Sequence, residues 1–309
     1  MSNVLLGTAI GDALGVPFET KLVNNPALVK WDGKSFIGSE HHKLQPGQYS
    51  DDTQMSLMVA ESLVENKGFN PEDLATRYVD WIVSGRARGY GKTTLLAVHN
   101  LLEGKPYNQS GVPGSYGNGT AMRAAPIGVF FRNDLEEVIN VCKVDSAITH
   151  ASEEAEAGSI AIAFTAALAA TNDTEDLLER VHSVLPDSKV KSIIYSLGSL
   201  IDARHIPASS ALRVLGTKAD VRQTVPSALY CFLKFNNYHD AILAAIKAGG
   251  DTDTTAAIVG GLFGAKLGMK AIDQAFYGVE DFDRLVELDS QLYNRSNDSF
   301  LLTGSSSHY

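Results

Sequence analysis

Two segments of the sequence bring together several oxygen-bearing side chains just ahead of an apolar helical pattern. They are residues 49–53 (YSDDT) and residues 249–255 (GGDTDTT). Carboxylates and hydroxyls are the ligands that Mg²⁺ takes in proteins, and Mn²⁺ accepts them too. Neither segment contains histidine or cysteine, which argues against zinc. The two segments therefore suggest a site for hard cations, provided that the fold brings them together.

Helix capping is the alternative explanation of the same residues. Ser, Thr and Asp are the preferred N-cap residues, each worth about 1 kcal/mol, and acids in the first turn add a little more. Capping explains one acid per helix better than two. Asp251 and Asp253 are two positions apart, so they converge only in a turn, and the preceding Gly249-Gly250 pair favours such a turn. If all four acids met, two charges about 4 Å apart would repel by about 4 kcal/mol at an effective dielectric constant of 20, so cations or protons would be needed.

A glycine-rich segment, residues 111–119 (GVPGSYGNG), precedes an expected helix over 120–130. Such a loop presents free backbone N–H groups to an anion, and Tyr116 is suited to stack on a flat ring. An ordinary surface turn is the alternative. Residues 89–93 (GYGKT) are similar to part of a phosphate-binding P-loop, but Arg86 stands where that pattern needs glycine. We therefore reject a nucleoside triphosphatase.

The remaining candidates are weak when taken singly. His150 lies near a helix end and is typical of a capping or surface histidine. His41 and His42 lie in an irregular loop and are expected to be solvated. Glu19 follows the first helix and alone would pass as a surface acid.

The elements that must position all of these residues are expected to be helices. Apolar residues recur at steps of three and four in most of the chain, and alternating strand patterns are scarce. The expected helices include 52–63, one opening at Pro71, 134–147, 153–170, 174–184, 190–201, 239–248 and 255–267. Without a linker or a shift in composition, we expect one all-α, compact multi-helix domain over 1–302 and a solvated tail over 303–309.

Composition limits the class of protein. The chain has 309 residues, a net charge of −10 and 44% hydrophobic residues, which is ordinary for a globular protein. The acidic balance argues against bulk binding to nucleic acid or to an anionic membrane surface. Two cysteines cannot form a disulfide framework, and no segment reads as a signal peptide or a membrane span. A cytoplasmic protein is expected.

Taken together, the motifs resemble the ADP-ribosylglycohydrolase family, which includes the dinitrogenase reductase-activating glycohydrolase and the ADP-ribosyl-acceptor hydrolases. The matching segments, in family order, are residues 7–15 (GTAIGDALG) with Glu19, residues 50–53 (SDDT), residues 89–91 (GYG), residues 114–123 (GSYGNGTAMR), residues 149–150 (TH) and residues 249–254 (GGDTDT). Any one of these segments is a weak signal, whereas the ordered set is specific.

The resemblance implies an all-α hydrolase with two Mg²⁺ or Mn²⁺ ions as cofactors, acting on an ADP-ribosylated protein or a small ADP-ribose conjugate. By position, the metal ligands would be Ser50, Asp51, Asp52, Asp251, Asp253 and Thr254. The catalytic acids would be Glu19, Asp52 and Asp253. The substrate contacts would be Gly89, Tyr90 and Gly91 over the ribose, Gly114, Ser115 and Tyr116 at the diphosphate and distal ribose, His150 near the adenosine half, and Gly119 and Met122 of the same glycine motif.

Two departures from the family pattern bear on this expectation. Many members carry Thr where this chain has Ser50, and the oxygen ligand survives that change. Members of the dinitrogenase reductase-activating type have an acid after the Gly-Tyr motif, where this chain has Lys92-Thr93-Thr94. The general base would then be Glu19 or a metal-held aspartate. Hydrolysis of a free ADP-ribose derivative and a non-catalytic ADP-ribose-binding relative remain the alternatives.

Overall fold

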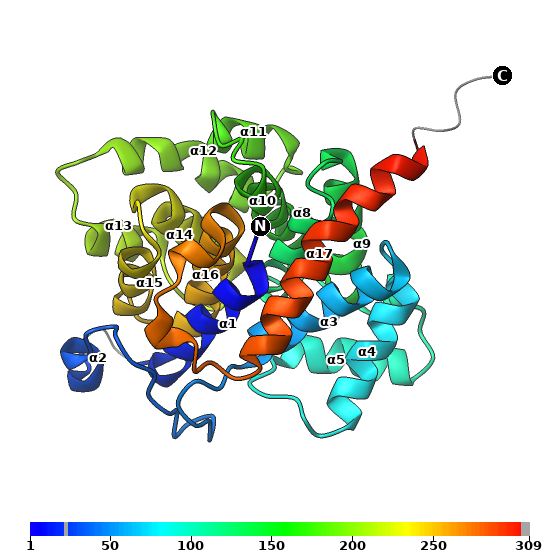
Figure 1. Ribbon diagram of the computed structural model, residues 1–309, viewed down its shortest axis with the longest axis horizontal. Helices are drawn as coiled ribbons and strands as arrows, with labels where there is room; N and C mark the ends of the chain where they lie inside the picture. Colours follow the sequence, from blue (N-terminus) through cyan, green and yellow to red (C-terminus); the bar gives the residue numbers. More distant parts are fainter. Residues whose placement is uncertain (22–23, 304–309) are drawn as a thin grey trace.

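Three helices that are apolar on nearly every side form the centre of the molecule (Figure 1): α1 (Val4–Gly15), α10 (Glu153–Ala170) and α16 (Thr252–Leu267). A helix without a polar face has to be covered all round, and the other helices supply that cover. This computed structural model describes residues 1–21 and 24–303, with side chains of the last helix described as far as Arg295.

The surrounding helices are, in chain order, α2 (Pro26–Lys30), α3 (Asp51–Asn66), α4 (Pro71–Val83), α5 (Lys92–Leu102), α6 (Tyr107–Ser110), α7 (Gly119–Met122), α8 (Ala125–Phe130), α9 (Leu135–Thr149), α11 (Leu177–Val184), α12 (Lys189–Asp202), α13 (Ala208–Leu215), α14 (Val221–Lys234), α15 (Tyr238–Lys247) and α17 (Phe282–Thr303). Short 3₁₀ turns occupy Val16–Phe18, Gly268–Ala271 and Gln274–Phe276. Within the described residues, the only strands are β1 (Val112–Pro113) and β2 (His150–Ala151), a parallel pair. The predicted all-α fold is confirmed.

Helices α1 and α16 run antiparallel and touch through their backbones. A Cβ atom on Gly7 would lie 2.2 Å from the carbonyl oxygen of Gly260, and one on Gly11 would lie 2.1 Å from that of Ala256. At the far end, a Cβ on Gly15 would lie 2.5 Å from the Cα of Asp253. Only glycine permits so close an approach. The seam therefore brings the end of α1 directly against the start of α16.

Helix α17, red in Figure 1, lies across α1, α3 and α8. Its buried Asp289 accepts hydrogen bonds from the N–H groups of Leu5 (2.9 Å) and Leu6 (3.1 Å), so it satisfies the free backbone donors at the start of α1. The predicted tail over 303–309 lies outside the described residues, except for Thr303, where α17 ends.

Most predicted helices are present, with ends that move by one to three residues. The single helix expected over 120–130 is wrong. It is split into α7 and α8 because Pro126 has no N–H to continue the ladder. The prediction lacks helices α2, α5, α6, α13, α14 and α17. Helix α14 carries Pro226 in its interior, which obscures the helical pattern.

Candidate functional site

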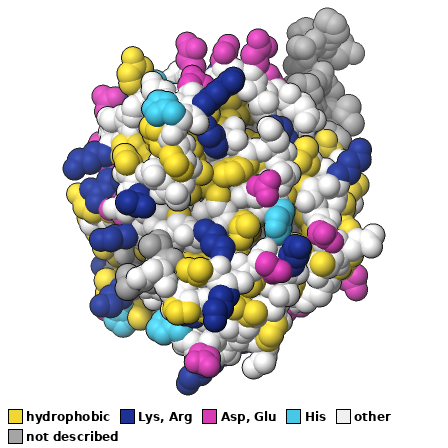
Figure 2. Space-filling view, turned by 90° about the vertical axis from the view of Figure 1, so that its left-hand side faces the viewer, with side chains coloured by type: hydrophobic (Ala, Val, Ile, Leu, Met, Phe, Trp, Pro, Cys, Tyr) yellow, Lys and Arg dark blue, Asp and Glu magenta, His cyan; other side chains and the backbone are white. Residues whose placement is uncertain are grey.

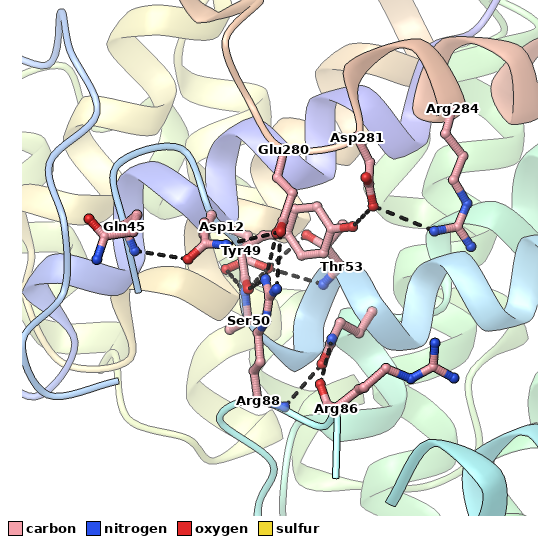
Figure 3. Close-up of polar contacts among 12 residues, drawn as sticks. Asp12, Gln45, Tyr49, Ser50, Thr53, Arg86, Arg88, Glu280, Asp281 and Arg284 are labelled. Carbon is pink, nitrogen blue, oxygen red and sulfur yellow. Dashed lines mark hydrogen bonds and ion pairs between the residues drawn. The ribbon is translucent and has the colours of Figure 1, made fainter. Parts of the chain in front are cut away.

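The start of α3 is anchored by an aspartate from another helix. Asp12 on α1 is fully buried and accepts hydrogen bonds from the N–H groups of Ser50 (3.0 Å) and Thr53 (3.0 Å), and from the Thr53 hydroxyl (2.7 Å). Figure 3 shows Asp12 reaching this turn. The sequence prediction did not include Asp12, although a lone acid within an apolar helix was the available signal. The Ser50 hydroxyl, at the N-cap of α3, accepts from the N–H of Asp52 (3.3 Å), so Ser50 and Asp12 together cap this helix and the carboxylates of Asp51 and Asp52 are not needed for capping.

The two acidic segments meet at this point. The Asp52 Oδ2 atom accepts hydrogen bonds from the hydroxyls of Ser50 (3.1 Å) and Thr254 (3.3 Å), although α3 and α16 are far apart in sequence. The Thr252 hydroxyl donates to the Gly15 carbonyl (2.8 Å), which fixes the start of α16 against α1. All six predicted metal ligands are buried: Ser50, Asp51, Asp52, Asp251, Asp253 and Thr254.

This cluster of buried carboxylates is not neutralised by the protein. Within the described residues, no Lys or Arg forms an ion pair with Asp12, Asp51, Asp52, Asp251 or Asp253. The Oδ1 atom of Asp52 is buried and has no hydrogen-bond partner. Burial raises the pKa of Asp12 to about 6, and burial together with the neighbouring carboxylates raises the pKa of Asp52 and Asp253 well above the usual range. An arrangement of this kind needs positive charge from outside the chain.

In the second segment, Asp253 accepts from the N–H of Thr254 (3.0 Å) in the first turn of α16, whereas helix capping does not account for Asp251. Asp251 is the N-cap residue of α16, yet its side chain caps no N–H group of that helix. Instead, its Oδ2 atom accepts from the side-chain amide of Asn118 at 2.5 Å, and the same amide donates to Thr224 at 3.0 Å. Asn118 belongs to the glycine motif, yet no pattern in the sequence marks it as a site residue. It connects the glycine-rich loop directly to the acidic cluster.

Glu19 and His42 form a pair beside the cluster. The Nε2 atom of His42 is hydrogen-bonded to Oε2 of Glu19, and this bond raises the pKa of His42. Potential ligand atoms of Glu19, His42 and Asp253 all lie within 4.8 Å of one another. The expectation that His42 is solvated is therefore wrong. No local pattern in the sequence indicates this pair, because Glu19 and His42 lie far apart in the segment between the first helix and α3.

The loop at residues 89–91 lies against the cluster. Gly89 has a φ of +70°, and a Cβ there would lie 2.9 Å from Oδ1 of Asp51. Tyr90 is exposed and packs edge-on against Trp81, with ring centroids 5.8 Å apart. Gly91 is the N-cap residue of α5. Close approach and positive φ together require glycine at position 89.

The second glycine-rich loop lies next to the segment that follows residues 89–91. The Ser115 hydroxyl lies 3.2 Å from that of Thr93, which joins this loop to the start of α5. Tyr116 is exposed, and the guanidinium of Arg222 lies over its ring at 4.1 Å. Gly114 has a φ of +68°. The two tyrosines at positions 90 and 116 thus remain open to solvent around a buried acidic centre.

A fully buried ion pair supports the glycine-rich loop on its buried side. Arg123 donates through Nε to both carboxylate oxygens of Asp145, at 3.1 and 3.0 Å, and both side chains are inaccessible to solvent. His150 is also buried, against Gly117 and Gly119, and burial lowers its pKa to about 3, so its imidazole is neutral. Met122 is buried on α7, with its backbone facing Ser56 of α3. These residues line the inner side of the loop rather than its surface.

Comparison with known protein families gives a match over nearly the whole chain. The model of the ADP-ribosylglycohydrolase family matches residues 2–300. The chain belongs to the ADP-ribosylglycohydrolase family. Its relatives include an uncharacterized protein of Archaeoglobus fulgidus, 30% identical over 94% of this chain and 95% of the relative.

Two further relatives carry functional names. The mouse ADP-ribosylhydrolase ARH3 is 27% identical over 95% of this chain and 91% of its own length. The ADP-ribosylarginine hydrolase Tri1 of Pseudomonas putida is 29% identical over 95% of this chain and 81% of its own length. A solved ADP-ribosylglycohydrolase-related protein complex superposes with a TM-score of 0.79 at 26% identity, covering 95% of this chain and 96% of the other.

The surface adds two observations. No helix in the described part of the chain is long and apolar enough to cross a membrane. On the face shown in Figure 2, Lys and Arg side chains are scattered among hydrophobic ones. The net charge of −10 is therefore not spread as an unbroken acidic surface over this face.

Proposed function

We propose that this protein is a hydrolase that uses two divalent cations, Mg²⁺ or Mn²⁺, to cleave the glycosidic bond between ADP-ribose and its acceptor. The observation that carries the proposal is the unneutralised cluster of buried carboxylates, with one carboxylate oxygen of Asp52 left without a partner. The potential ligand atoms of this cluster are all hard oxygens, which fit Mg²⁺ or Mn²⁺. Family membership favours the same chemistry.

The ligands we propose are Ser50, Asp51, Asp52, Asp251, Asp253 and Thr254. Cations bound there would hold the hydroxyls of the distal ribose and lower the pKa of an attacking water. Asp12 keeps the α3 turn in place, and Asn118 orients Asp251. The chain's own contribution is a fixed, water-poor geometry for these oxygens.

Proton transfer is assigned to the acids that the family resemblance marks as catalytic. Water attacks the anomeric carbon as the bond to the acceptor breaks, through an oxocarbenium-like transition state. Glu19, Asp253 or Asp52 accepts the water proton and passes it to the departing acceptor. Glu19 is the preferred base because it is the half-exposed member of the group and its carboxylate is oriented by His42.

The substrate half of the proposal rests on the two glycine loops. Gly89, Tyr90 and Gly91 would cover the distal ribose, and Gly114, Ser115 and Tyr116 would contact the diphosphate. Gly119, Met122 and the neutral His150 would support the adenosine side. Remote contacts of this kind orient the reacting bond. An ADP-ribosylated arginine is the first acceptor to test, because a relative is named an ADP-ribosylarginine hydrolase.

Release of ADP-ribose from arginine- and serine-ADP-ribosylated proteins, with Mg²⁺, Mn²⁺ or EDTA, tests the proposal. Metal-dependent release from either would support it, and the preferred conjugate would name the acceptor. Tight binding of ADP-ribose without release would favour a free ADP-ribose derivative or a binding role. Asp240→Asn, an exposed first-turn acid of α15, is the matched control for acid substitutions in the cluster.

A further inference from the structure

Arg88, one residue before the loop at 89–91, forms a two-pronged ion pair with Glu280, just ahead of α17 (Figure 3). Its two terminal nitrogens lie 2.5 and 3.0 Å from the two carboxylate oxygens of Glu280. One of those nitrogens also donates to the backbone carbonyl of Tyr49 at 3.1 Å. Bidentate Arg–carboxylate pairs fix orientation as well as distance.

The partners of Arg88 are themselves held in place. The N–H of Glu280 donates to the Gly47 carbonyl (2.9 Å), and the Gln48 side-chain amide donates to Glu280 (3.0 Å). The Tyr49 hydroxyl donates to Asp281 at 2.7 Å. Residues 280–281 are thus tied to residues 47–49, which lead directly into the Ser50 turn.

The backbone of the same loop is tied to α3. The N–H of Arg88 donates to the side-chain oxygen of Gln54 (3.0 Å), whose amide donates to the Arg86 carbonyl (3.0 Å). The next residue, Gly89, has no room for a Cβ beside Asp51. Any displacement of Arg88 is therefore passed on to the loop that covers the acidic cluster.

We propose that the Arg88–Glu280 pair is a positioning device, through which the segment ahead of α17 sets the placement of residues 89–91 for substrate. This inference rests on the proposed function, because the loop is taken to cover the distal ribose. The pair touches neither substrate nor the metal ligands. We expect its effect on substrate affinity to exceed its effect on cation affinity, because Asp12 also holds the turn at Ser50 through the N–H groups of Ser50 and Thr53.

The test uses Arg88→Ala, Arg88→Lys, Glu280→Ala and the double variant R88A/E280A. Arg86→Ala is the matched control, because its side chain bonds Ser84 two residues away rather than a carboxylate. The measurements are the KM and kcat for ADP-ribose release, the Kd for ADP-ribose and the Kd for Mn²⁺. We expect KM and the ADP-ribose Kd to rise about tenfold in Arg88→Ala, with the Mn²⁺ Kd changed by less than about twofold.

Two patterns separate positioning from a general structural role. Arg88→Lys is expected to recover only part of the affinity, since an ammonium cannot bond both oxygens, and the double variant is expected to be no weaker than either single variant. Equal ADP-ribose affinity in wild type and Arg88→Ala would overturn the inference while leaving the proposed function intact. A wild-type protein that neither cleaves nor binds ADP-ribose conjugates would overturn both.

Discussion

Two regions of this protein bury charge, and they do so in opposite ways. Arg123 and Asp145 neutralise each other, and Arg123 also donates to the Asp145 carbonyl (3.0 Å) and the Thr149 hydroxyl (2.9 Å), with the Tyr78 ring below it. The buried charged side chains of the acidic cluster between α3 and α16 are all carboxylates. The first region is complete without a ligand, whereas the second leaves an oxygen of Asp52 unpartnered.

This difference separates a structural site from a functional one. A satisfied buried pair fixes the loop at 114–123 and requires nothing from outside. A set of like charges is unfavourable in isolation and is stabilised when cations bind or when the carboxylates take up protons. Unfavourable electrostatic energy is therefore confined to the acidic cluster, where binding is expected. The Arg123–Asp145 pair, which only supports the glycine-rich loop, carries no such energy.

The largest effect is expected from removing one charge of the cluster. Asp52→Asn or Asp253→Asn should lower turnover by at least about 10³-fold, since each removes a proposed ligand and acid. The melting temperature of the metal-free variant should not fall, because the substitution relieves repulsion. Enzyme assays with added Mn²⁺ and thermal unfolding in EDTA check the two halves. Full activity in either variant would sink the proposed role.

Breaking the Arg123–Asp145 pair should have the opposite effect, a loss of stability. Arg123→Met leaves Asp145 buried without its partner, which typically costs about 3–5 kcal/mol of stability. Denaturant unfolding in EDTA measures this loss. If Arg123→Met unfolded like the wild type while Asp52→Asn did not, the distinction between the two regions would be wrong.

Asp289 offers an intermediate case, a buried acid with backbone donors and, in the described part of the chain, no ion pair with Lys or Arg. Burial raises its pKa to about 7 from the model-peptide value of 3.8. The folded state therefore keeps its proton longer than the unfolded state, and this group's contribution to stability falls as pH rises from about 4 to about 7. Asp289→Asn should remove up to about 1.4 kcal/mol per pH unit from the slope across that window. Parallel pH profiles of unfolding for both proteins would contradict this account.

The sequence predicted the parts of the site that are local. Residues 50–53 and 249–254 contain their own ligand types, and the all-α pattern was visible in their flanking helices. Asp12, His42, Asn118 and Glu280 were missed because their roles depend on partners brought near by the fold. Gly7 and Gly11 belong to a family motif, and only the structure shows that they permit the contact between α1 and α16.

Thermal unfolding with and without divalent cations tests the central claim most directly. The wild-type protein should melt about 5 °C higher in saturating Mn²⁺ or Mg²⁺ than in EDTA, because cations bind the folded cluster and not the unfolded chain. Asp52→Asn should lose most of this shift, and the exposed-acid control Asp240→Asn should keep it. Identical melting of the wild type in cation and in EDTA would contradict the assignment of the acidic cluster as a metal centre.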